Sequence, residues 1–293
     1  MLIKRGAAAC VIVAVLSLVL GACGGRGDTT AVASRSMSGP AMLPFEGDGL
    51  DRRVDGYTFA QLRNTATVGK PGELSFVIDN PQGQPQKDFT LQQTKLLHMY
   101  VVRDDLTEFQ HIHPGLDHRT GRWTVPITFA EPGPYRVVIE FEALTADGNF
   151  DDRILGAGLR VPGAYRPVPF SPVLGTNTVD GYAVTMPATA AVRGPDLRLT
   201  VTKGGAGVTD IQQYLQSYAH VTGFRQGSLQ TVHVHPLEVP PFRTDPNAVG
   251  GPNLTLMSMF TEPGVYRMFI QFQTDGRVHT VPLDITVTAP ADH

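Results

Sequence analysis

The stretch FAEPGPYRVVIEF, residues Phe129–Phe141, returns later in the chain as FTEPGVYRMFIQF, residues Phe260–Phe272. Both copies place a glycine two residues before a tyrosine, at the entry to a run of strand-forming apolar residues. This arrangement is typical of the tyrosine corner of immunoglobulin-like β-sandwiches, in which the tyrosine hydroxyl bonds back to the backbone. We therefore expect Tyr135 and Tyr266 to be the corner residues of two related sandwiches.

The two stretches belong to a tandem repeat that runs through most of the chain. DGYTF at Asp55 returns as DGYAV at Asp180, and GELSFVIDN at Gly72 returns as PDLRLTVTK at Pro195. The matching stretches keep their order, but the number of residues that separates the two copies varies along the chain, as expected when insertions accumulate in loops. A period of more than 120 residues indicates two domains rather than the short units of a solenoid.

Each copy is predicted to be all-β. Short apolar or alternating runs such as LSFVID, HMYVV and YRVVIEF are separated by Gly, Pro and Asp, and no segment keeps a helical apolar period. The expected fold is two tandem immunoglobulin-like or cupredoxin-like β-sandwiches. We place repeat 1 at 51–163, a proline-rich linker at 164–176 and repeat 2 at 177–289. Glu131 and Glu262, at the start of each EPG, are interpreted as turn residues rather than catalytic acids.

The N-terminus has the features of a targeting segment. Lys4 and Arg5 precede an apolar stretch that ends in LGAC at Cys23. This string resembles the lipobox of bacterial lipoproteins, in which the cysteine is lipidated after cleavage. The resemblance implies a signal peptide at 1–22, a palmitate-type lipid anchor on Cys23, a flexible tether at 23–50, and a place on the extracytoplasmic face of the cell membrane. An uncleaved membrane anchor is the alternative, although the apolar run is shorter than about 20 residues.

Composition excludes several classes of function. Among 293 residues, 42% are hydrophobic and 17% are charged, which is typical of a globular protein. The net charge of -3 and the lack of a basic stripe argue against nucleic acid as a partner. Cleavage would remove Cys10 and lipidation would occupy Cys23, so we expect no disulfide, thiolate metal site or cysteine nucleophile.

The histidines follow a spacing that recurs in both copies. LLHMYVVRDDLTEFQHIHP, residues 96–114, and YAHVTGFRQGSLQTVHVHP, residues 218–236, both read H-x12-H-x-H-P. The six residues of this pattern are His98, His111 and His113 in the first copy, and His220, His233 and His235 in the second.

A hairpin would bring the histidines of each set together. If Asp104–Asp105 is a two-residue turn, His98 lies directly opposite His111, with Cβ atoms about 5 Å apart. His113 then lies on the same face, because residues i and i+2 of a strand point the same way. In the second copy a turn on Gln226–Gly227 would place His220 opposite His233 in the same way. The spacing therefore predicts two patches of three imidazoles.

Three convergent imidazoles favour a transition metal, copper first and zinc second. The interpretation is a metal carrier or buffer, not an enzyme, because no repeated carboxylate stands beside the histidines as a base. A metal-free interaction or structural lipoprotein of the cell envelope, with the histidines as internal struts, is the first alternative. A zinc hydrolytic enzyme with three histidine ligands is the second. The sequence leaves open whether the histidines make one shared site or two separate sites.

Other candidate ligands have weaker support. His118 lies in a loop, has no counterpart in the second copy, and is expected to be solvated. Met257 and Met259 share a strand face and could offer thioethers to Cu(I), but core packing is the preferred interpretation. Met99 is expected to point away from the histidine face by alternation.

The first histidine stretch resembles a family of secreted and lipid-anchored bacterial proteins with a strand of the form H-[LM]-x-V-V-R-x-D-L-x-x-F-Q-H-[IVL]-H-P. The chain is especially similar to actinobacterial lipoproteins with two such repeats, and this implies a relationship to periplasmic copper-handling sandwiches. The positions that match in the first copy are His98, Arg103, Asp105, Leu106, Phe109, Gln110, His111, His113 and Pro114. In the second copy Thr222 and Gly223 depart from the pattern, so equal function of the two sets is not implied. The protein partner stays unknown.

Overall fold

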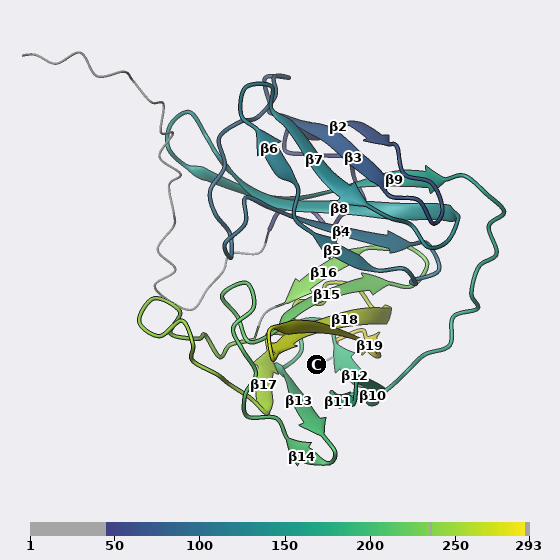
Figure 1. Cartoon of the computed structure of the whole chain (residues 1–293), viewed down its shortest axis with the longest axis vertical. Helices are drawn as coiled ribbons and strands as arrows, with labels where there is room; N and C mark the ends of the chain where they lie inside the picture. The colour runs from purple at the N-terminus through teal and green to yellow at the C-terminus, as the bar shows by residue number, and fades with distance from the viewer. Residues whose placement is uncertain (1–44, 235, 291–293) are drawn as a thin grey trace, which may run out of the picture. The chain divides into compact units, whose positions relative to one another are not determined.

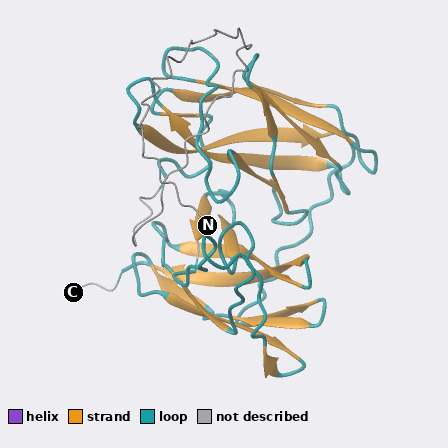
Figure 2. Ribbon diagram, turned by 60° about the vertical axis from the view of Figure 1, so that its left-hand side comes forward, coloured by secondary structure: helices purple, strands orange, loops and turns teal. Residues whose placement is uncertain are grey.

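The computed structural model describes residues 45–234 and 236–290. Within them all regular secondary structure is β-strand, joined by turns and loops (Figure 2). No helix of these residues is long and apolar enough to span a membrane. The predicted signal peptide, Cys23 and most of the tether lie outside the described residues. The expected all-β fold of two tandem β-sandwiches is confirmed.

Repeat 1 consists of two antiparallel sheets (Figure 1). One sheet has the strand order β1-β2-β3-β7-β6 and the other has the order β5-β4-β8-β9. The strands are β1 (Arg53–Val54), β2 (Tyr57–Asn64), β3 (Gly72–Asp79), β4 (Leu97–Arg103), β5 (Gln110–Ile112), β6 (Gly115–Asp117), β7 (Arg122–Ile127), β8 (Gly133–Leu144) and β9 (Phe150–Val161).

Repeat 2 has the same two-sheet plan with some differences at its edges (Figure 1). One sheet follows β10-β11-β13-β14, with β17 also paired to β13, and the other follows β12-β19-β18-β15-β16. The strands are β10 (Thr176–Val179), β11 (Tyr182–Thr185), β12 (Thr189–Ala191), β13 (Leu197–Lys203), β14 (Ala206–Gly207), β15 (His220–Arg225), β16 (Thr231–Val234), β17 (Asn253–Leu256), β18 (Gly264–Thr274) and β19 (Arg277–Thr288).

The tyrosine corner is present in both repeats. The Tyr135 hydroxyl donates to the backbone oxygen of Glu131 at 2.7 Å, and the Tyr266 hydroxyl donates to that of Glu262 at 2.9 Å. Each tyrosine ring is buried in its own core, so the bond fixes the entry of β8 or β18 against the sandwich. The two glutamates are turn residues, as the EPG motif predicted, and the corners support an immunoglobulin-like arrangement.

Strand β4 is buried on both faces. Leu97, Met99 and Val101 belong to the core of repeat 1, as the alternation predicted for Met99. Tyr100 and Val102 point the other way and join a separate apolar cluster with residues of repeat 2, including Phe224, Leu229 and Phe269. The stacked rings of Phe109 and Phe269 lie 4.1 Å apart in this cluster. The face of β4 that carries His98 is therefore covered by repeat 2.

The segments flanking repeat 1 are hydrogen-bonded to both repeats. The Asp48 carbonyl accepts from Thr231 N at 2.7 Å, and Glu46 exchanges backbone bonds with β9, so residues 45–50 at the end of the expected tether are part of the fold. In the linker, Val168 N donates to Asp105 Oδ2 and Ser171 O accepts from Arg267. These bonds attach the connector to each sandwich in turn.

Candidate metal centre

The hairpins that carry the histidines have a register two residues away from the expected one. Tyr100, not His98, pairs with His111, and Thr222, not His220, pairs with His233. The expected two-residue turns are wrong, because the connections between the paired strands are longer. Within them Leu106 and Leu229 have left-handed backbone conformations, both with φ 63°. A shift of two residues preserves the face of each side chain, so the predicted convergence survives.

In repeat 1 the three histidines meet. His98 Nδ1 lies 3.1 Å from His111 Nε2 and 3.2 Å from His113 Nε2. The three offer ligand atoms that all lie within 4.8 Å of one another, the one such group of His, Cys, Asp and Glu found among the described residues. His98 is buried on β4, whereas His111 and His113, on and just after β5, are half-buried. The cluster thus has a closed side and a more open side.

Hydrogen bonds fix which nitrogens face the centre. A backbone carbonyl can only accept, so His98 Nε2, 3.1 Å from the oxygen of Gln92, carries the hydrogen. His111 Nδ1 lies 2.7 Å from Oε1 of Gln271 and donates to it. In the neutral rings this leaves His98 Nδ1 and His111 Nε2 as bare lone pairs, pointing at each other across 3.1 Å. In the metal-free chain His113 Nε2, 3.2 Å from His98 Nδ1, can donate to that lone pair, whereas a bound cation would be shared by all three rings.

Burial opposes protonation of all three rings. Burial lowers the pKa of His98 to about 4, and the nearby Glu140 carboxylate only partly opposes that effect. Burial, with the charges of His98 and Lys95 next, lowers the pKa of His113 to about 3. The pKa of His111 is also lowered well below its usual value, chiefly by burial. All three rings are neutral at pH 7, the state that a metal requires.

The repeat 2 histidines lie beside this group and have different partners. The His220 ring is stacked on that of His111 at 4.5 Å, and its Nε2 lies 3.0 Å from the Tyr100 hydroxyl. His233 Nδ1 lies 2.6 Å from Oε2 of Glu140, a carboxylate from repeat 1. His235 lies outside the described residues. The structure therefore brings His220 and His233 to the same region as the first set.

Sequence reasoning missed Glu140 and Gln271, the two residues that reach across between repeats. They hold the same place in the recurring runs VVIEF and MFIQF, and both are buried. A polar residue at the same position of these two otherwise apolar runs is a signal that could have identified them, since buried polar groups need partners. The partners of Glu140 and Gln271 depend on how the two repeats pack together, so they are seen only in the structure.

The remaining candidates lie elsewhere. His118 is exposed in its loop. His279 is buried between Asp180 and Thr274, with its nitrogens 2.9 and 3.0 Å from their oxygens. Met257 is half-buried, and Met259 packs against the core of repeat 2, as the packing interpretation expected. His293 lies outside the described residues.

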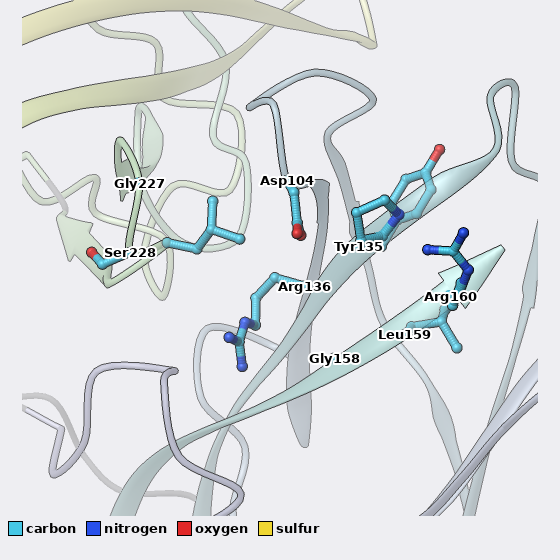
Figure 3. A pocket seen from close by; sticks show the side chains of 10 residues that line it. Asp104, Tyr135, Arg136, Gly158, Leu159, Arg160, Gly227 and Ser228 are labelled. Atoms are coloured by element: carbon cyan, nitrogen blue, oxygen red, sulfur yellow. The ribbon is translucent and has the colours of Figure 1, made fainter. Parts of the chain in front are cut away.

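A separate cleft of about 410 Å³ contains no histidine. Its lining includes Asp104, Arg136 and Arg160 with the β15–β16 loop residues Gly227 and Ser228, and Figure 3 shows these side chains. Burial raises the pKa of Asp104, and the charge of Arg136 opposes that rise. The cleft is lined by a set of groups distinct from the histidine cluster.

Comparisons with known proteins give a family and only distant structural likeness. A family model described as Domain of unknown function (DUF8832) matches residues 52–149 and 177–289. No curated protein matches the sequence. The Escherichia coli adhesin FdeC is similar over 80% of this chain and 66% of its own, at 13% identity and TM-score 0.24. Native α-2-macroglobulin of Escherichia coli is similar over 80% of this chain and 72% of the matched chain, at 12% identity and TM-score 0.25.

Proposed function

The chain belongs to the DUF8832 family, whose domain of unknown function it contains twice, and we propose that it binds a transition metal through His98, His111 and His113. The observation that carries this proposal is the pair of bare imidazole nitrogens 3.1 Å apart, with the third nitrogen at 3.2 Å. Nitrogens bound about 2.0–2.1 Å from one tetrahedral ion lie about 3.3 Å apart, close to this spacing. A bound cation would be coordinated by these nitrogens in place of the contacts that the rings make with one another.

The donor set supports copper first and zinc second. Imidazole nitrogen suits both ions, and for a given nitrogen site divalent copper binds more tightly than divalent zinc. Three protein ligands leave room for a further ligand, and half-buried His111 and His113 give access from one side. Three histidine ligands with an open position also form catalytic zinc sites. The proposal is a carrier or buffer because Glu140, the carboxylate near the cluster, is engaged with His233 and is not placed as a free base.

Metal analysis of the purified full chain tests the proposal. We expect one tightly bound equivalent in competition titrations with Cu(II) and with Zn(II), and its loss in His113→Ala. The half-buried His113 is chosen because its removal disturbs the core least. His118→Ala, which changes an exposed loop histidine, is the matched control and should bind as the unaltered chain does. Equal binding by His113→Ala and the unaltered chain would rule out this site.

We also propose that the protein is anchored by lipid at Cys23 on the extracytoplasmic face of the cell membrane. The lipobox-like LGAC after a charged and apolar leader supports this. Only a thiol can carry the thioether-linked lipid, so Cys23→Ser should abolish labelling by a radioactive fatty acid at that position. Undiminished label in the variant would show that the anchor lies elsewhere.

The second candidate function, a metal-free structural role, is favoured for the repeat 2 histidines. His220 contacts the Tyr100 hydroxyl and His233 contacts the Glu140 carboxylate, so both make polar contacts between the repeats. Such histidines act as interface struts. Metal titration of a His233→Ala variant separates the roles, because a strut leaves the affinity of the first set largely unchanged.

A further inference from the structure

The two repeats exchange hydrogen-bond partners at their histidine clusters. Gln271 of repeat 2 accepts from His111 Nδ1 of repeat 1 at 2.7 Å, and Glu140 of repeat 1 contacts His233 Nδ1 of repeat 2 at 2.6 Å. His111 and His233 are equivalent positions, the first histidine of each HxHP, and Glu140 and Gln271 are equivalent positions of β8 and β18. The contact is therefore made reciprocally, by the same pair of positions in both directions.

Gln271 contacts both His111 and the neighbouring strand β19. Its Nε2 donates to the Thr280 hydroxyl at 3.1 Å on the neighbouring strand β19, which leaves Oε1 to face His111. Only 6% of the Gln271 surface is exposed, so water does not compete freely for this oxygen. The amide therefore selects the tautomer of His111 with hydrogen on Nδ1 and a bare Nε2 toward His98. Outer partners of this kind fix the orientation of metal-bound histidines in general.

We propose that Gln271 is a positioning residue for the histidines of repeat 1, so that their metal centre is complete only when repeat 2 is docked. This proposal rests on the proposed function for its metal readout, whereas its effect on the His111 tautomer stands without any metal. Under this proposal the second repeat contributes to the site of the first, because repeat 2 supplies a group that orients a ligand of repeat 1. Repeat 2 then controls the affinity of a site whose three ligands all belong to repeat 1.

The amide at position 271 also sets the charge next to His111. Gln271 accepts the His111 hydrogen without adding a negative charge, whereas its counterpart Glu140 presents a carboxylate to His233. A carboxylate acceptor makes a ligating imidazole more basic. Gln271→Glu should therefore keep the His111 tautomer and bind a divalent ion at least as tightly as the unaltered chain.

The test uses the full chain with Gln271→Leu, which removes the acceptor, and Gln271→Glu, which retains one. Gln273→Leu is the matched control, because Gln273 is also on β18 but bonds to Gln212 rather than to a histidine. Nitrogen-15 NMR of the metal-free chain reports the His111 tautomer, and a titration with Zn(II) alone reports affinity. We expect Gln271→Leu to lose the Nδ1–H tautomer and about 10- to 100-fold in affinity. Gln271→Glu should preserve both.

Two results would overturn the proposal. One is an unchanged tautomer and affinity in Gln271→Leu, and the other is an equal loss in Gln273→Leu, which would indicate a general packing effect. The failure of the proposed function looks different: neither the unaltered chain nor any variant would bind Zn(II), while the NMR tautomer would still respond to Gln271→Leu. If Gln271→Leu does not fold, the retained tautomer and affinity of Gln271→Glu, against their loss in Gln271→Asn with its shorter side chain, decide the matter.

Discussion

The two repeats have the same frame but use their histidines differently. In repeat 1, His98 and His111 donate outward to neutral oxygens of Gln92 and Gln271 and turn bare nitrogens toward each other. In repeat 2, His220 and His233 contact the phenol and the carboxylate that repeat 1 supplies through Tyr100 and Glu140. The same spacing of histidines thus brings three imidazoles together in one copy and gives His220 and His233 polar contacts between the repeats in the other.

This difference shows that the partners, rather than the histidine spacing, determine the role of each set. Residue 100 is tyrosine in repeat 1, and its counterpart in repeat 2 is Thr222, which is buried and has no phenol ring. The reciprocal contact from β8 is a carboxylate and that from β18 is an amide. The carboxylate places a negative charge beside His233, whereas the amide orients His111 without adding charge.

The largest expected effect comes from removing ligands in one repeat at a time. His111→Ala with His113→Ala removes two of three nitrogens and should abolish binding of Cu(II), because one remaining imidazole cannot hold the ion tightly. The matching pair in repeat 2, His233→Ala with His235→Ala, should cost much less, since His233 contacts the Glu140 carboxylate and is not one of the cluster of three. Calorimetric titration of both double variants decides this. Equal losses would contradict the asymmetry between the repeats.

Acid should destabilise the metal-free chain through repeat 1. The pKa of His98 is about 4 in the folded protein, against about 6.5 for an unfolded chain. The unfolded state therefore takes up a proton first as pH falls, so this stability is complete above pH 6.5 and is lost between 6.5 and about 4. Within that window each such histidine contributes a slope of about 1.4 kcal/mol per pH unit.

Chemical denaturation from pH 7.5 to 4.5, with EDTA present, measures this slope. His98→Gln should flatten the dependence of the free energy of unfolding on pH, and His118→Gln, which changes an exposed loop histidine, is the control. The low pKa also moves proton competition for the metal to more acidic conditions, so Zn(II) should still stabilise the chain at pH 5. An identical slope for His98→Gln and the unaltered chain would contradict this account.

Alternation along the strands allowed the histidine cluster to be predicted from the sequence, even though the pairing was wrong. His98, His111 and His113 share a face in either register, because the register differs by two residues and side-chain direction depends only on parity. The correct register depends on Leu106, whose left-handed backbone is unusual for leucine. Leu106 is buried in the apolar cluster between the repeats, and that packing with repeat 2 is not readable from local sequence.

The departure of Gly223 from the apolar pattern of repeat 1 also has a structural reason. Gly223 pairs with Met268 across β15 and β18, and the equivalent pair in repeat 1 is Val101 with Val137. A Cβ atom on Gly223 would lie 2.4 Å from Met268 Sδ. The larger methionine thus requires the smaller glycine, a compensation between strands that lie far apart in the sequence.

Gly223→Val should therefore destabilise the chain by about 1–3 kcal/mol through overpacking. Adding Met268→Val restores the pair found in repeat 1 and should recover part of the loss, because the new Cβ atom would still lie 2.7 Å from Val232 Cγ1. Urea denaturation of the two single variants and the double variant gives the coupling energy between the positions. Additive losses in the double variant would show that Gly223 is required for its backbone rather than for space.

The smallest expected effect concerns the tyrosine corner, which both repeats have. Removing the hydroxyl in Tyr135→Phe or in Tyr266→Phe leaves the ring in the core but breaks the bond to the EPG turn, at a cost of about 1 kcal/mol. The losses should be similar, because the two bonds have lengths of 2.7 and 2.9 Å and join equivalent residues. Neither variant should change metal affinity, since the corners lie away from the histidines in each repeat. Urea denaturation with unchanged m-values measures the stability loss, and Zn(II) titration checks the affinity. A change of affinity in Tyr135→Phe alone would mean that the frame of repeat 1 is coupled to its metal centre, and that the two sandwiches differ in more than their histidine partners.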